Sequence, residues 1–139
     1  MSDAGTVFWR DLARDLQDPE FLREYVVESL RIATIDRIVN ALDQAREAAG
    51  LSKAELARAI GSQPAVIRRL FTSQTASPTL GTLAEVAGAL GMRVTLTPMD
   101  ETERKDVTQS LLAGHASDPE GLAKHLAELR ESKRDLVPC

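Results

Sequence analysis

The sequence lacks the features of three classes of protein. Its one cysteine is Cys139, so no disulfide framework is expected and a cytosolic location fits. No apolar run reaches the roughly 18 residues that a membrane span needs. The N-terminal stretch MSDAGTVFWRDLARD is acidic and has no apolar segment of a secretory signal. We therefore expect a cytoplasmic protein that is neither disulfide-bonded, secreted nor inserted in a membrane.

Signs of catalysis and of metal binding are also missing. His115 and His125 are ten residues apart with no cysteine nearby, which is not metal-ligand spacing, and both are expected at the surface. There is no glycine-rich phosphate loop and no nucleophile elbow. The acidic residues of the N-terminal helices are expected on a solvated face rather than in a catalytic pair. We therefore expect no enzyme, no metal and no cofactor.

Helical periodicity runs through most of the 139 residues and predicts an all-α fold. The expected helices cover residues 6–17, 20–30, 34–49, 52–60, 63–71, 79–90, 100–114 and 120–132. Whether the second and third are one helix stays open, because no glycine or proline forces a break between them. Four aromatic residues are expected in the core rather than stacked on bases: Phe8, Trp9, Phe21 and Tyr25. The segments predicted are an N-terminal helical extension (1–33), a central domain (34–99) and an acidic helical C-terminal segment (100–139).

Charge is distributed unevenly along the chain. Residues 1–50 carry six basic and ten acidic side chains, and residues 100–139 carry six and nine. Residues 51–99 carry five basic and two acidic side chains, a regional charge of +3 against −4 for the whole chain. Affinity for phosphates depends on charge within about 8–10 Å rather than on the total. The central segment is therefore the part suited to nucleic acid.

Residues 51–70, LSKAELARAIGSQPAVIRRL, read as two short helices joined by a tight turn at Gly61. Ser52 and Glu55 have the spacing of a capping box at the start of the first helix. Ala57 is placed where the two helices pack, so a larger side chain would separate them. This is the pattern of a helix-turn-helix, which places its second helix in a DNA groove.

The second helix supplies the expected base contacts. Arg69 has the reach for two hydrogen bonds to guanine, and Gln63 for adenine or a phosphate. Ala65 suits a thymine methyl group, while Lys53 and Arg68 are assigned to phosphates. The predicted DNA-binding residues are Ser52, Lys53, Ser62, Gln63, Pro64, Ala65, Arg68, Arg69, Thr72, Ser73 and Thr75.

The segments LSKAELARAIG, IRRL and SPTLGTLAEVAGALGM resemble the Xre/Cro-type helix-turn-helix family over about residues 35–92. The resemblance implies a lambda-repressor-like helical bundle and a phosphate contact by Lys53. It also implies that four residues face the groove: Gln63, Pro64, Ala65 and Arg69. Pro64 departs from the pattern, because that position often holds a base-reading polar residue, and Phe71 replaces an acidic one. The expected base contacts therefore narrow to Gln63, Ala65 and Arg69.

One short strand is expected at residues 92–98, MRVTLTP, where Val94 and Leu96 alternate with polar residues. A solitary strand leaves its backbone groups unpaired, so it must pair with the N-terminal segment or with its copy in a dimer. We favour the dimer, because two-fold pairing would also set the spacing of two recognition helices.

The longer arrangement, with helices flanking the helix-turn-helix, resembles HigA-like antitoxins. That resemblance implies a homodimeric repressor that binds a palindromic operator in double-stranded DNA and neutralises a RelE/HigB-type ribonuclease toxin. Its half-sites would lie about 34 Å apart. Two alternatives stay open: a stand-alone Xre-type regulator with no toxin, and a protein-docking adaptor whose helix-turn-helix does not contact DNA.

Overall fold

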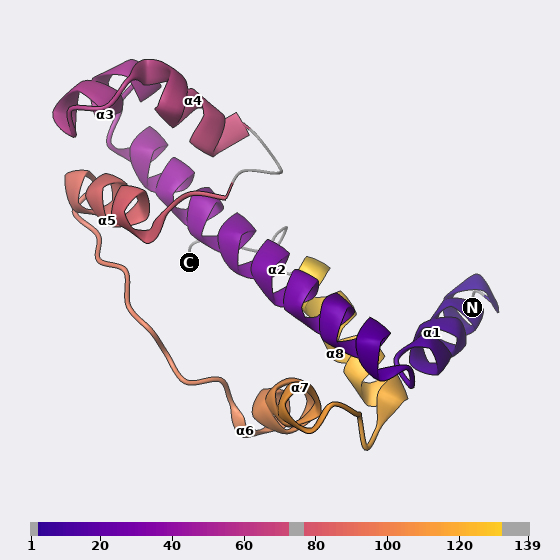
Figure 1. The fold of residues 1–139 in the computed structure, drawn as a ribbon. Coiled ribbons are helices and arrows are strands. Elements are labelled where there is room, and N and C mark those ends of the chain that lie inside the picture. Colours follow the sequence, from indigo (N-terminus) through magenta and orange to yellow (C-terminus); the bar gives the residue numbers. More distant parts are fainter. Residues whose placement is uncertain (1–2, 73–76, 132–139) are drawn as a thin grey trace. The chain divides into compact units, whose positions relative to one another are not determined.

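The computed structural model describes residues 3–72 and 77–131, and these are mostly helical (Figure 1). The elements are α1 (Asp3–Asp15), α2 (Pro19–Ala48), α3 (Lys53–Ala59), α4 (Pro64–Thr72), α5 (Leu80–Ala89), α6 (Glu101–Glu103), the π-helical turn η1 (Arg104–Thr108), α7 (Gln109–Ala113) and α8 (Pro119–Glu131). The all-α prediction is confirmed. None of these helices is long and apolar enough to cross a membrane.

An Asp-Pro pair starts each of two helices, α2 and α8. Asp18 Oδ1 accepts a hydrogen bond from the backbone N–H of Glu20 at 3.0 Å, and Pro19 takes the first helical position of α2. Asp118 does the same for α8, accepting from the N–H of Gly121 at 3.1 Å. Helix α2 then runs unbroken for 30 residues. The two helices expected at residues 20–30 and 34–49 are therefore one helix, and no glycine or proline interrupts its interior.

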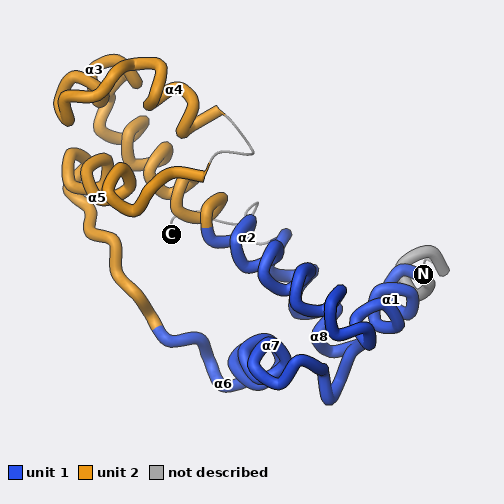
Figure 2. The backbone as a smooth tube through the Cα atoms, viewed as in Figure 1, with its two compact units in different colours: residues 1–34, 98–135 blue, residues 35–97, 136–139 orange. Residues whose placement is uncertain are grey.

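The chain forms two compact units, which divide α2 between them (Figure 2). Unit 1 comprises residues 1–34 and 98–135, and unit 2 comprises residues 35–97 and 136–139. Each unit has its own cluster of buried apolar side chains. The N-terminal extension and the acidic C-terminal segment therefore share one core, although they are far apart in the sequence.

The core of unit 1 joins α1, the first part of α2, η1 and α8. Its buried residues are Leu12, Leu16, Leu22, Val26, Val107, Leu122, Ala123 and Leu126. Trp9, Phe21 and Tyr25 pack against this cluster as predicted. Phe8 was expected there too, but it is 51% exposed and meets Trp9 only edge-on.

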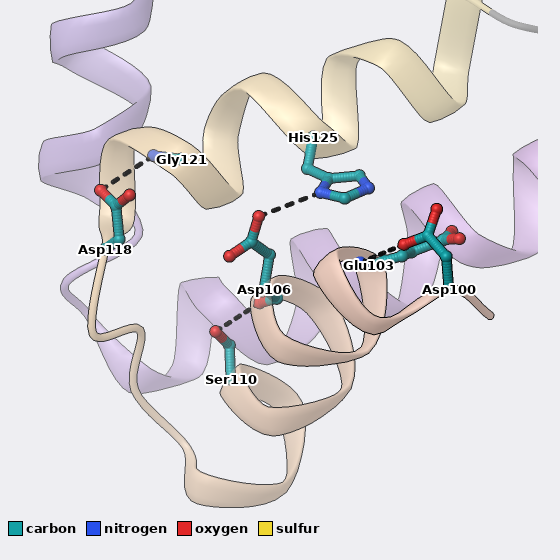
Figure 3. Close-up of polar contacts among 7 residues, drawn as sticks. All are labelled: Asp100, Glu103, Asp106, Ser110, Asp118, Gly121 and His125. Carbon is teal, nitrogen blue, oxygen red and sulfur yellow. Dashed lines mark hydrogen bonds and ion pairs between the residues drawn. The ribbon is translucent and has the colours of Figure 1, made fainter.

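His125 also differs from its expected place at the surface. Its side chain is only 18% exposed, and its Nδ1 lies 3.1 Å from Asp106 Oδ2, which joins α8 to η1 (Figure 3). The buried hydroxyl of Ser110 donates to the carbonyl oxygen of Asp106 at 2.6 Å. Asp106 is thus held on both its backbone and its side chain, which fixes the π-helical turn against α8.

The core of unit 2 joins the second part of α2 to α3, α4 and α5. Its buried residues are Leu42, Leu56, Ala57, Ile67, Leu70, Leu83, Val86 and Ala87. Within α3, α4 and α5 these residues have the spacing of one helical face. Leu80 is apolar but 69% exposed, because it is the first residue of α5, directly after the N-cap Thr79.

The strand expected at residues 92–98 is wrong for the single chain. The described residues contain no strand, and this segment is extended without regular structure. Val94 is 36% exposed and Leu96 fully exposed. A strand needs a neighbour with which to exchange backbone hydrogen bonds, and sequence alternation alone does not supply one.

Candidate nucleic-acid interface

The start of α3 is fixed by the predicted capping box. The Ser52 hydroxyl accepts from the N–H of Glu55 at 3.0 Å, and Glu55 Oε1 accepts from the N–H of Ser52 at 2.8 Å. The backbone N–H of Ser52, the Ser52 hydroxyl and the nearby positive charge of Arg58 favour the ionised Glu55 carboxylate and so lower its pKa. Ser52 therefore lies exposed at the N-terminus of α3, with Lys53 partly exposed beside it.

The turn between α3 and α4 depends on a left-handed residue. Gly61 has φ of +69°, a conformation that costs other residues steric strain. Its N–H donates to the carbonyl of Arg58 at 3.2 Å, and the N–H of Ser62 donates to the carbonyl of Ala57 at 2.8 Å. The predicted turn at Gly61 is confirmed. The backbone N–H of Ser62 is used in a hydrogen bond of this turn.

Packing then sets the orientation of α4. Leu56 and Ala57 of α3 and Ile67 of α4 are fully buried, and Leu70 is 4% exposed. Of the two neighbouring apolar residues Val66 and Ile67, Ile67 is the buried one. Val66 is 39% exposed and joins the outer face of α4.

Most of the predicted DNA-binding residues lie on the outer face of α4 or directly before it. Gln63, Ala65, Arg68, Arg69 and Thr72 are all exposed, while Ser62 and Pro64 are partly buried. The Thr72 hydroxyl is occupied by a hydrogen bond to the carbonyl of Arg68 within the helix. The predicted contacts Ser73 and Thr75 lie outside the described residues.

The electrostatic character of this surface is positive. Between residues 53 and 72 the only acidic residue is Glu55, against Lys53, Arg58, Arg68 and Arg69. Within the described part of the chain, the Arg68 and Arg69 guanidinium groups take part in no ion pair and no aromatic contact. Both cations are thus available at the exposed face, which suits phosphate or guanine as a partner.

Phe71, the departure from the family pattern, has a structural role that sequence reasoning missed. It packs against the unit 2 core, and the guanidinium of Arg46 lies 5.8 Å from its ring centroid. Arg46 also donates to the carbonyl of Leu51 at 2.8 Å and pairs with Asp43 at 2.9 Å. An aromatic ring at position 71 therefore helps tie α4 to α2 and to the loop before α3.

Residues 42–96 match the model of a family described as helix-turn-helix. No curated protein and no solved structure matches the chain. The matched range covers α3, the turn at Gly61, α4 and α5, which form the site described above. The match connects this part of the chain with a family of DNA-binding transcriptional regulators and not with a family of enzymes.

Proposed function

We propose that this protein is a sequence-specific DNA-binding repressor that inserts α4 into the major groove. The observation that carries the proposal is the exposed face of α4, which presents Ala65, Arg68 and Arg69, with the exposed Gln63 directly before the helix. Gln63, Ala65 and Arg69 are assigned to base edges, and Arg68 and Lys53 to phosphates. The buried residues on the opposite side of α4 hold this face outward.

A gel-shift assay on the protein's own promoter, at two salt concentrations, tests this assignment. We expect Arg68→Ala/Arg69→Ala to weaken binding about 100-fold, since one bidentate base contact is worth about 1–3 kcal/mol and a phosphate contact adds to it. The salt slope should also fall by about one for each phosphate that the variant no longer neutralises. The matched control is Arg104→Ala/Lys105→Ala, two exposed basic residues of η1 in unit 1. Equally weakened binding in both double variants would show that α4 is not the reading helix.

The repressor is proposed to act as a homodimer through residues 92–98. Met92, Val94 and Leu96 are exposed apolar residues at every second position, so they would share one face of a strand. Met92 and Val94 also line a cavity of about 210 Å³, together with Leu42 and Ala87. Pairing two copies antiparallel would give both segments the backbone partners that one chain lacks.

Sedimentation of the full chain tests the homodimer. Leu96→Asp places a charge in the proposed seam and should convert dimers to monomers. Leu112→Asp is the control, since Leu112 is 78% exposed in unit 1. A dimer that survives Leu96→Asp but not Leu112→Asp would move the interface to unit 1.

The resemblance to HigA-like antitoxins favours a regulator that represses its own operon and neutralises a RelE/HigB-type toxin. The alternative is a stand-alone regulator with no toxin. The gene beside its own separates them: an antitoxin should rescue cells that express that neighbour and co-purify with its product. A neighbour that is harmless when expressed alone would favour the stand-alone regulator.

A further inference from the structure

Unit 1 contains an open groove that DNA binding does not use. It has a volume of about 500 Å³ and lies between the first part of α2 and the end of α8. The lining residues are Phe21, Glu24, Tyr25, Val27, Glu28 and Arg130. Apolar and aromatic groups form most of its wall, and two carboxylates and one guanidinium complete the lining.

The wall of this groove is built from side chains that hold one another. The rings of Phe21 and Tyr25 stack with centroids 5.5 Å apart and an interplanar angle of 19°. The Arg130 guanidinium lies 4.5 Å from the centroid of Tyr25, and its Nε donates to the hydroxyl of the buried Ser29 at 2.8 Å. A partner therefore meets a preorganised wall and loses little entropy in ordering it.

Three exposed residues of the groove lining are the apolar Val27 and the acidic Glu24 and Glu28. Val27 is 47% exposed. Glu24 and Glu28 are exposed one helical turn apart, and within the described residues neither is in an ion pair. Like charges at this spacing disfavour the helix by a few tenths of a kcal/mol, so a cation placed between them would be favourable. Unit 1 as a whole carries ten basic and sixteen acidic residues, a charge of −6.

We propose that this groove docks a basic amphipathic helix of another protein. An apolar side chain of that helix enters between Tyr25 and Val27, and its lysines or arginines reach Glu24 and Glu28. A second copy of this chain fits poorly, because the contact would bring together two units that each carry a charge of −6. The charge of −6 likewise disfavours DNA at this surface.

Fluorescence anisotropy with the full chain tests the proposal. The probe is a labelled helical peptide with leucines on one face and lysines on the other, compared with the same peptide carrying glutamates. We expect the lysine peptide to bind and the glutamate peptide not to bind. Glu24→Lys/Glu28→Lys should weaken that binding at least about tenfold, since two attractions become repulsions, and Val27→Asp should weaken it several-fold. Circular dichroism confirms that each variant is folded.

The matched control is Asp15→Lys/Glu128→Lys, which changes the net charge equally at exposed residues that do not line the groove. It should retain affinity within about twofold. Equally weakened binding in the two double variants would mean that the peptide is attracted to the acidic unit in general and not to the groove. That result would overturn the proposal. Residues 132–139, SKRDLVPC, share the basic and apolar chemistry of the proposed partner. Binding that occurs only after deletion of 132–139 would make the chain's own C-terminus the occupant and also overturn the proposal.

Discussion

The two units of this chain share one helix but carry opposite charge. Unit 2 has seven basic and five acidic residues, a charge of +2, whereas unit 1 is at −6. The net charge of −4 therefore describes neither unit. Unit 2 contains the part of the chain that matches a helix-turn-helix family and carries exposed arginines on α4, while the groove of unit 1 is lined by Glu24 and Glu28, which form no ion pair among the described residues. The comparison favours a division of labour in which one unit contacts DNA and the other contacts protein.

The strongest way to test this division is to damage one core at a time. Leu126 in unit 1 and Leu56 in unit 2 are both fully buried, so either leucine-to-alanine change should cost about 2–5 kcal/mol. If the units are separate cores, Leu126→Ala should speed hydrogen exchange in α1 and α8, and Leu56→Ala in α3, α4 and α5. Mass spectrometry of the exchanged peptides measures this.

Each of these two variants is the control for the other. DNA affinity gives a second measurement. Leu126→Ala should leave the affinity for DNA nearly unchanged in conditions where unit 2 stays folded. Faster exchange throughout the chain in both variants would mean a single cooperative unit, and the comparison between two units would fail.

A smaller effect is expected at the turn of the helix-turn-helix. Gly61→Ala places a side chain at φ of +69° and should destabilise unit 2 by about 1–2 kcal/mol, even though the site has open space around it. Gly88→Ala is the control, because Gly88 is inside α5 with no positive φ. That change should instead stabilise the helix by about 0.5–1 kcal/mol. Thermal melts of both variants measure the difference, and a stabilised Gly61→Ala would show that the turn does not need a left-handed residue.

Sequence reasoning succeeded where the signal is local. The Ser52–Glu55 box, the turn at Gly61 and the buried stripe through Ile67 and Leu70 each lie within a few residues of their partners. Caps and periodicity encode such features directly. For the same reason, the order of the helices and the outer face of α4 could be predicted from the sequence alone.

Sequence reasoning failed where the deciding contact is distant. Arg130 donates a hydrogen bond to Ser29, which is 101 positions away in the sequence. No local sequence pattern predicts that the N-terminal and C-terminal segments share a core. The alternation at 92–98 predicted a strand, but the partner that would make it one is absent from a single chain. Phe8 and Leu80 have the right residue type for the core but are 51% and 69% exposed, and helical periodicity alone does not predict this exposure.

The smallest expected effect is a pH dependence confined to unit 2. The folded protein lowers the pKa of Glu55 because the Ser52 N–H and hydroxyl bond to its carboxylate. The ionised carboxylate therefore contributes stability at neutral pH, and this contribution is lost as the pH falls through the lowered pKa. Glu55→Gln keeps an acceptor but not the charge, so the gap in melting temperature between wild type and this variant should be present at pH 7 and close in strongly acidic buffer. Glu85→Gln removes one charge from α5 in the same unit and corrects for the change in net charge. A gap that stays constant across this range would mean that the charge of Glu55 does not support the start of α3, and that the capping box stabilises it by hydrogen bonding alone.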